Sequence, residues 1–320
     1  MWYINYTHGV LLLPVNLGYA CINMGLSTLP PKKRVTTNRT MIQKTFKQRG
    51  INYAAELALL NVQDLYKILQ WNTQNGFNFY RMSSDMFPWA SEYGIYNLPN
   101  IEEISTILKK CGDFAKANNQ RLSFHPGPFN KLTSSNDRVT TNTIKDLKVH
   151  ADIMDLMGLS NTHYNKINIH VGATYKDKDA AVAQFLRNFE LLPDNIKGRF
   201  TLENDDKASL YSVKDLYHHI YKQTGIPIVF DYHHHSLNSG GVPLHDALHM
   251  AVSTWGNIKP VVHYSESRAT EQKIKCPLQA HSDYVYSRID TYGLDVDVMV
   301  EAKMKELAVI KYLQLHKEAA

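Results

Sequence analysis

One unit recurs along the chain: a short apolar, β-branched or aromatic run, then a loop, then a longer segment whose apolar residues lie three and four positions apart. The short runs predict strands, and there are eight: Leu17–Asn23, Phe77–Arg81, Arg121–His125, Lys166–His170, Phe200–Glu203, Pro227–Asp231, Pro260–Tyr264 and Asp297–Glu301. The longer segments predict helices: Ala54–Leu69, Ile101–Ala117, Ile144–Met157, Ala180–Leu192, Val213–Tyr221, Leu244–Val252 and Lys303–Leu315.

This alternation predicts an α/β fold with a parallel sheet, and eight strands favour a closed (β/α)8 TIM barrel. An open doubly wound sheet is the alternative. No Gly-x-Gly-x-x-Gly follows any predicted strand, so the usual dinucleotide signature of that alternative is absent. We therefore predict a single barrel domain over residues 17–320, preceded by an N-terminal extension of residues 1–16 whose role is unknown.

Composition excludes several classes of protein. The chain of 320 residues is 44% hydrophobic and 20% charged, which excludes a disordered or fibrous protein. Three widely spaced cysteines, Cys21, Cys111 and Cys276, form no disulfide framework and favour a reducing, intracellular compartment. The apolar run Val10–Leu13 is too short to span a membrane, so we expect no membrane partner.

Most of the predicted strands end in a polar residue of a type that performs chemistry: Asn23, Arg81, His125, His170, Glu203, Asp231, His263 and Glu301. In a barrel these ends converge on the C-terminal rim, where active sites lie. Carboxylates buried together would repel one another, and a bound cation resolves that repulsion. Carboxylate and imidazole ligands without thiolates suit Zn, Mn or Fe, and ligands from several strands suit more than one ion.

Spacing suggests two more ligands. His234 lies three residues after Asp231, close enough for both to reach one metal, and His281 opens the segment between the last two strands. Consecutive side chains point in different directions, so at most one or two of the residues 233–235 face the rim, and we favour His234.

Three predicted rim loops are basic. The chain has 35 basic and 30 acidic residues, a net charge of +5. Several of the basic residues cluster at Lys32, Lys33 and Arg34, at Lys176 and Lys178, and at Arg268, Lys273 and Lys275. Together with nearby aromatic residues such as Tyr19 and Phe129, these loops predict a surface for phosphates and unstacked bases.

The strand-end motifs follow one another in an order that resembles the UV damage endonuclease family, a metal-dependent barrel similar to endonuclease IV and the xylose-isomerase-like barrels. The resemblance covers about residues 17–315. Its motifs are Leu-Gly-Tyr-Ala-Cys-Ile-Asn (17–23), Phe-Tyr-Arg-Met-Ser-Ser-Asp (79–85), Ser-Phe-His-Pro-Gly (123–127), Asn-Ile-His-Val-Gly (168–172), Leu-Glu-Asn-Asp-Asp (202–206), Phe-Asp-Tyr-His-His (230–234), Val-His-Tyr-Ser-Glu (262–266), Ala-His-Ser-Asp-Tyr (280–284) and Val-Glu-Ala-Lys (300–303).

The resemblance implies eight metal ligands, the same set that strand ends and spacing suggest: His125, His170, Glu203, Asp231, His234, His263, His281 and Glu301. It implies two or three Mn²⁺ ions, and we expect Glu203 to bridge them and Glu203, His234 and Glu301 to be catalytic. The family's lesion-probing positions fall on Tyr19, Asn23 and the pair Pro128 and Phe129. Arg81 and the basic residues Lys32, Lys33 and Arg34 are further candidate DNA contacts.

Three positions depart from the family pattern. Pro128 stands where the family typically has Gln, so the amide hydrogen bonds to a lesion are lost. Glu92 stands where a histidine is expected, and Val261 stands where some members have a modified lysine.

The resemblance implies a nick 5′ to UV photolesions in duplex DNA, which leaves a 3′-hydroxyl and a 5′-phosphate. The alternatives are an abasic-site endonuclease of the endonuclease IV type, a sugar isomerase on the same barrel, and a non-catalytic damage-binding protein with structural metals. We expect a monomer that acts on DNA inside the cell, in the nucleus of a eukaryote or the cytoplasm of a prokaryote.

Overall fold

The computed structural model describes residues 6–7, 10–11 and 15–317. Eight parallel strands form one sheet in the order β5-β4-β3-β10-β9-β8-β7-β6. A parallel bridge between Phe124 and Ile167 joins the two outer strands of that order, so the sheet closes into a nearly complete barrel. The strands are β3 (Asn16–Ala20), β4 (Phe79–Arg81), β5 (Arg121–Ser123), β6 (Ile167–His170), β7 (Phe200–Glu203), β8 (Ile228–Asp231), β9 (Val261–Tyr264) and β10 (Asp297–Val300).

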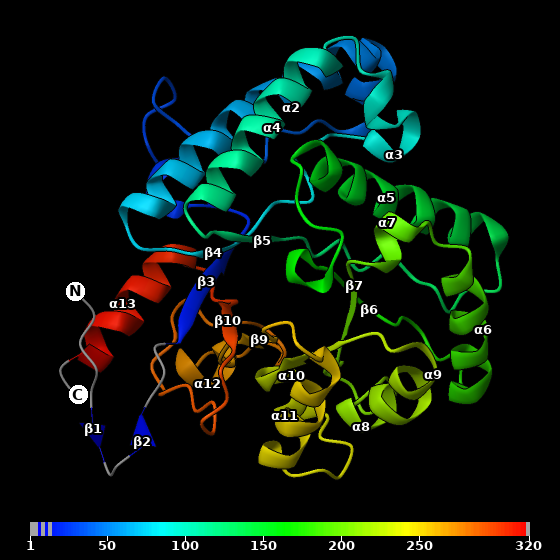
Figure 1. Cartoon of the computed structure of the whole chain (residues 1–320), viewed down its shortest axis with the longest axis vertical. Helices are drawn as coiled ribbons and strands as arrows, with labels where there is room; N and C mark the ends of the chain where they lie inside the picture. Colours follow the sequence, from blue (N-terminus) through cyan, green and yellow to red (C-terminus); the bar gives the residue numbers. More distant parts are fainter. Residues whose placement is uncertain (1–5, 8–9, 12–14, 318–320) are drawn as a thin grey trace.

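Helices surround the strands, as Figure 1 shows. The longer ones are α2 (Gln43–Gln74), α4 (Ile101–Ala117), α5 (Asp137–Leu156), α6 (Lys178–Glu190), α11 (Leu244–Val252) and α13 (Lys305–Lys317). The shorter ones are α1 (Met24–Ser27), α3 (Ala90–Tyr93), η1 (Ile95–Asn97), η2 (His163–Asn165), α7 (Asp194–Lys197), α8 (Val213–Asp215), η3 (Leu216–Tyr221), α9 (Lys222–Thr224), α10 (Tyr232–Leu237), η4 (Ser253–Trp255) and α12 (Arg268–Glu271).

The predicted barrel is confirmed, with differences at element ends. The helix expected over Ala54–Leu69 extends over the whole of α2, which is interrupted at Gly50, where φ is 66°. The strand expected to reach Asn23 stops at Ala20, because Cys21 has a positive φ of 68° and turns the chain. Asn23 instead caps α1, and its Oδ1 accepts from the backbone N–H of Leu26 at 2.9 Å.

The barrel interior is filled below the rim. A cluster from five strands, Ala20, Phe79, Val229, Val261 and Met299, packs there with Trp255. Gly18 permits this packing, since a Cβ at that position would lie 2.6 Å from the carbonyl oxygen of Phe79. The interior is thus a packed core, and the polar strand ends lie above it.

At the opposite end of the strands a buried ion pair links β5 to β10. The Arg121 guanidinium lies 2.9 Å from Asp297 and also donates to the carbonyl oxygens of Lys259 and Tyr164, each at 2.8 Å. Arg121 and Asp297 are 1% and 3% exposed, so the pair is shielded from solvent.

Much of the extension predicted for residues 1–16 lies outside the described residues. Within it, β1 (Tyr6–Thr7) and β2 (Val10–Leu11) pair antiparallel, and Asn16 already belongs to β3. Its role as a separate segment stays a prediction.

Candidate metal centre

The carboxyl ends of the strands bring seven of the eight predicted ligands together. Three groups of side chains each offer ligand atoms within 4.8 Å of one another: His125, His170 and Glu203; Glu203, Asp231 and His234; and Asp231, His263 and Glu301. Glu203 belongs to two groups and so does Asp231. The arrangement can therefore hold neighbouring cations that share carboxylates.

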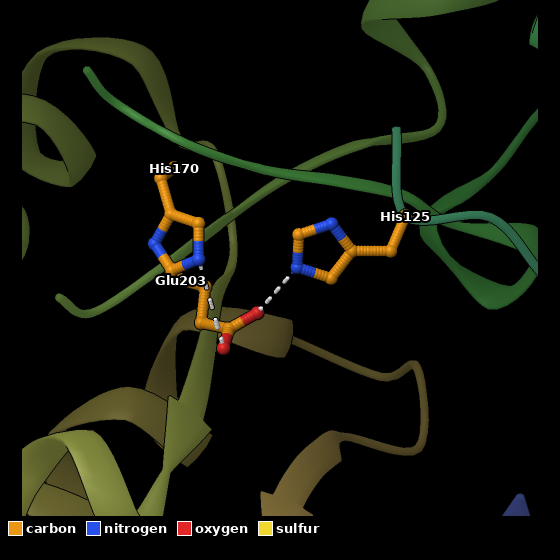
Figure 2. A group of neighbouring side chains, drawn as sticks. All are labelled: His125, His170 and Glu203. Carbon is orange, nitrogen blue, oxygen red and sulfur yellow. Dashed lines mark hydrogen bonds and ion pairs between the residues drawn. The ribbon is translucent and has the colours of Figure 1, made fainter. Parts of the chain in front are cut away.

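Glu203 lies at the centre of this cluster. Its Oε2 lies 3.0 Å from His125 Nε2 and 3.0 Å from His263 Nδ1, and its Oε1 lies 3.3 Å from His234 Nδ1. Figure 2 shows His125 and His170 pointing toward this carboxylate from separate segments. The carboxylate is 1% exposed, so its interactions with charged groups are little screened by water.

Glu301 forms the second carboxylate of the cluster. Arg81 makes an ion pair with Glu301 Oε1, and His263 Nδ1 lies 3.1 Å from the same oxygen. His281, the eighth predicted ligand, lies outside the three groups: its Nδ1 is 3.8 Å from Glu301 Oε2 and 2.7 Å from the backbone oxygen of Glu301. Its role as a ligand stays a prediction.

Asp231 supplies an observation that tests whether a cation fits. Its Oδ1 accepts from the backbone N–H of His234 at 2.8 Å, as the cap of α10. Its Oδ2 is buried and has no hydrogen-bond partner among the described residues. A buried carboxylate oxygen without a partner costs free energy, and a bound cation removes that cost. The donor set therefore suits divalent metal ions.

The pKa values of the cluster reflect burial and mutual charge. Burial lowers the pKa of His125 to about 4, although Glu203 opposes the shift. Burial also acts on His170 and His234, but nearby carboxylates outweigh it and raise their pKa values to about 10 and about 9. Burial raises the pKa of Glu203, yet His263 and His170 outweigh this effect and hold it well below its usual range.

Sequence reasoning missed three polar neighbours of the ligands. Asn168 Nδ2 donates to Glu203, and Asp205 Oδ1 lies 3.1 Å from His170 Nδ1. The buried Lys166 amine lies 3.2 Å from His263 Nε2, and burial lowers the pKa of Lys166 to about 7. For Lys166 and Asn168 the sequence did hold a signal. They lie four and two positions before His170, and side chains at such spacings along a strand point to the same side of the sheet.

The candidate DNA contacts divide into buried and exposed residues. Tyr19 and Asn23 are 0% and 1% exposed, and the Tyr19 hydroxyl donates to Asn72 on α2 at 2.6 Å. In this structure Tyr19 packs between the sheet and α2, so its contact with a lesion, like that of Asn23, stays a prediction. Phe129 is 87% exposed, and Lys32, Lys33 and Arg34 are exposed as well. Arg81 is occupied by Glu301 inside the cluster.

The model of the family described as UV-endonuclease UvdE matches residues 15–320. The chain belongs to this UV-endonuclease family. A UV DNA damage endonuclease of Bacillus thuringiensis subsp. konkukian is 33% identical over 310 residues, which are 94% of this chain and 94% of that protein. A UV-damage endonuclease of Schizosaccharomyces pombe is 35% identical over 92% of this chain and 49% of its own length.

Among solved structures, the crystal structure of SacUVDE superposes with a TM-score of 0.82 at 32% identity, over 95% of this chain and 99% of that one. The UvdE-family chain is accordingly an endonuclease with the predicted TIM-barrel fold. Within the described residues, none of its helices has the length and apolar character that crossing a bilayer requires.

Proposed function

We propose that the chain hydrolyses the phosphodiester bond 5′ to UV photolesions in double-stranded DNA, in a reaction that depends on divalent metal ions. The observation that carries this proposal is the position of Glu203 and Asp231, each shared between two groups of ligand-type side chains at the rim. Shared carboxylates suit the paired ions that assist phosphodiester cleavage. We further propose a monomer that acts inside the cell.

We propose that His125, His170, Glu203, Asp231, His234, His263, His281 and Glu301 would hold two or three Mn²⁺ ions. Such ions supply a bound water of lowered pKa and neutralise charge on the phosphate. Glu203 would be the shared ligand, because both of its oxygens face histidines. His234 is fixed in orientation, since its Nδ1 lies 2.9 Å from the backbone oxygen of Asn204.

The protein must also hold the carboxylates of Glu203 and Glu301 in place and position the DNA strand. Burial raises the pKa of Glu301, but the charges of Arg81, His263 and His281 together outweigh it and lower that pKa, and Arg81 makes the largest contribution of the three. Lys32, Lys33 and Arg34 would attract the phosphate backbone.

We place the damaged nucleotides in a cavity beside the ligands. It has a volume of about 760 Å³ and is bounded by His125, Gly127, Phe129 and Ser84, among others. Damage weakens stacking, so lesion nucleotides leave the helix at a lower cost than normal ones. The exposed ring of Phe129 would fill the space that they vacate.

The test uses supercoiled plasmid, UV-irradiated or untreated, incubated with the protein and either Mn²⁺ or EDTA. We expect nicking of the irradiated plasmid with Mn²⁺ only. Absence of metal-dependent nicking specific to irradiated DNA contradicts the proposal. A plasmid with abasic sites in place of photolesions tests the endonuclease IV-type alternative, because preferential cleavage there would favour it.

A matched pair of variants tests the role of Glu203. Glu203→Gln keeps the size of the side chain and removes its charge, so we expect nicking to be lost while damaged-DNA binding stays within several-fold. Glu190→Gln, on the exposed end of α6, is the control and should nick like the unmodified protein. Wild-type nicking by Glu203→Gln would show that this carboxylate is not the shared ligand.

A further inference from the structure

A second cavity lies on the rim, apart from the one beside His125. It has a volume of about 670 Å³ and is bounded by residues that follow β8 and β9 and by α12. The cavity beside His125 is bounded by residues that follow β3, β4 and β5. In the closed strand order, β8 is four strands from β4, and β9 is four strands from β5. The two cavities therefore flank the ligand cluster on opposite sides.

Unpartnered polar atoms gather on the walls of the second cavity. His233 Nε2, Ser265 Oγ, Ser267 Oγ and Glu271 Oε2 are all buried and have no hydrogen-bond partner within the described part of the chain. His233 and Ser265 are only 6% and 4% exposed. Buried polar groups are rarely left unpaired, so four of them around one cavity indicate a polar occupant.

The other wall residues restrict what the occupant can be. Tyr232 and Tyr264 also line the cavity and place their ring centroids 5.3 Å apart, which provides apolar surface suited to a flat ring. Burial and the negative charges of Asp283 and Glu266 raise the pKa of Glu271, although Lys311 and Arg268 oppose the shift. The two carboxylates on the cavity wall, Glu266 and Glu271, disfavour a phosphate group there. Serine hydroxyls can donate and accept, whereas a carboxylate accepts.

We propose that this cavity receives a nucleobase, and that its source is the DNA strand crossing the ligand cluster. The inference rests on the proposed function. With the lesion in the cavity beside His125, the strand on the 5′ side of the cut leads toward the second cavity. A base has an aromatic face for Tyr264, hydrogen-bonding edges for Ser265 and Ser267, and no charge.

The Glu271 carboxylate, a hydrogen-bond acceptor in the cavity wall, should make the site prefer some bases over others. Cytosine, adenine and guanine carry an exocyclic amino group that can donate to Glu271, and thymine does not. At one position 5′ to the cut, cleavage should therefore favour an amino-bearing base over thymine by about fivefold, the worth of one ordinary hydrogen bond.

The experiment measures kcat/KM on duplexes with a single defined pyrimidine dimer and C, A, G or T at each of the three positions 5′ to the cut. We expect the preference at one position in the unmodified protein. Glu271→Leu and, independently, Ser265→Ala should reduce it to less than twofold. Glu56→Leu removes an exposed carboxylate on α2 and should retain it. Uniform cleavage at all three positions, or a preference unchanged in both cavity variants, overturns the assignment to the strand.

A second arm distinguishes a DNA base from a free nucleoside. Equilibrium dialysis measures the binding of deoxycytidine alone to the unmodified protein and to the Glu271→Leu variant. Binding that depends on Glu271, alongside base-independent cleavage, identifies a free nucleoside as the occupant. No binding together with base-independent cleavage means that solvent fills the cavity and overturns the proposal. Failure of the proposed function has a different signature, because the unmodified protein would then not cleave the dimer-containing duplex at all.

Discussion

The ion pair between Arg121 and Asp297 makes a quantitative test of how this barrel is stabilised. Asp297→Asn preserves the shape of the side chain and leaves the Arg121 guanidinium, 1% exposed, with carbonyl oxygens and no carboxylate. Breaking a buried pair in this way costs about 3–5 kcal/mol, because an uncompensated charge stays buried. At about 2–3 °C per kcal/mol for a long chain, Tm should fall by roughly 6–15 °C.

Asp295 provides a matched control two residues earlier. Both carboxylates contact the Lys259 amine, Asp295 at 2.7 Å and Asp297 at 3.2 Å, but the Asp295 side chain is 56% exposed and that of Asp297 is 4%. An exposed ion pair contributes only about 0–1 kcal/mol, so Asp295→Asn should leave Tm within about 3 °C of the unmodified protein.

The assay is thermal unfolding followed by circular dichroism, with urea titration to obtain the free energy of unfolding. Nicking activity at 20 °C should be unchanged in both variants, since the pair lies at the end of the strands opposite the ligands. Equal Tm values for Asp297→Asn and Asp295→Asn would falsify the reasoning, because burial would then have no influence on the worth of the pair.

Three further outcomes are expected. His170 and His234 have pKa values of about 10 and about 9, so both carry protons at pH 7.5 when metal is absent. Metal binding should therefore release protons, and its affinity should increase as pH rises toward 9. Calorimetry in buffers of different ionisation enthalpy measures the proton release, and binding without proton release contradicts the prediction. Phe129→Ala should reduce cleavage of damaged DNA at least severalfold and change the free energy of unfolding by less than about 0.5 kcal/mol in urea titration, since the ring is 87% exposed; unchanged cleavage rules out a role at the lesion. Gly18→Ala should destabilise the barrel by about 1–3 kcal/mol, because the added Cβ would lie 2.6 Å from the Phe79 oxygen. An unchanged Tm would show that β3 and β4 can move apart enough to accommodate the methyl group without loss of stability.

The sequence was sufficient for the barrel and for most of the residues that the structure gathers as candidate metal ligands, because strand ends and spacing are both local signals. His125, His170 and His263 follow recognisable apolar runs, and parallel strands bring such ends together whatever the loops do. The resemblance to the family added the order of the motifs and the identity of the reaction.

Long-range packing accounts for what the sequence could not supply. Tyr19 looks like an available aromatic residue until α2 is seen to cover it and to offer Asn72 as a partner. Lys166 becomes part of the site only because β9 places His263 beside its amine. The cavity beyond β8 and β9 depends on side chains from several loops, which no short motif records.

The join between β5 and β6 has a consequence for folding. A single bridge, Phe124 to Ile167, holds these two edges of the sheet, whereas the other neighbouring strands share longer registers. His125 and His170 extend from the two sides of this seam, with ring centroids 5.6 Å apart and Glu203 between them. A cation bound by all three residues would cross-link β5 and β6, the pair of neighbouring strands with the shortest register in the barrel. Metal binding and closure of the sheet between β5 and β6 would then be coupled. Backbone amide hydrogens of these two strands should therefore exchange faster after a chelator removes the metal.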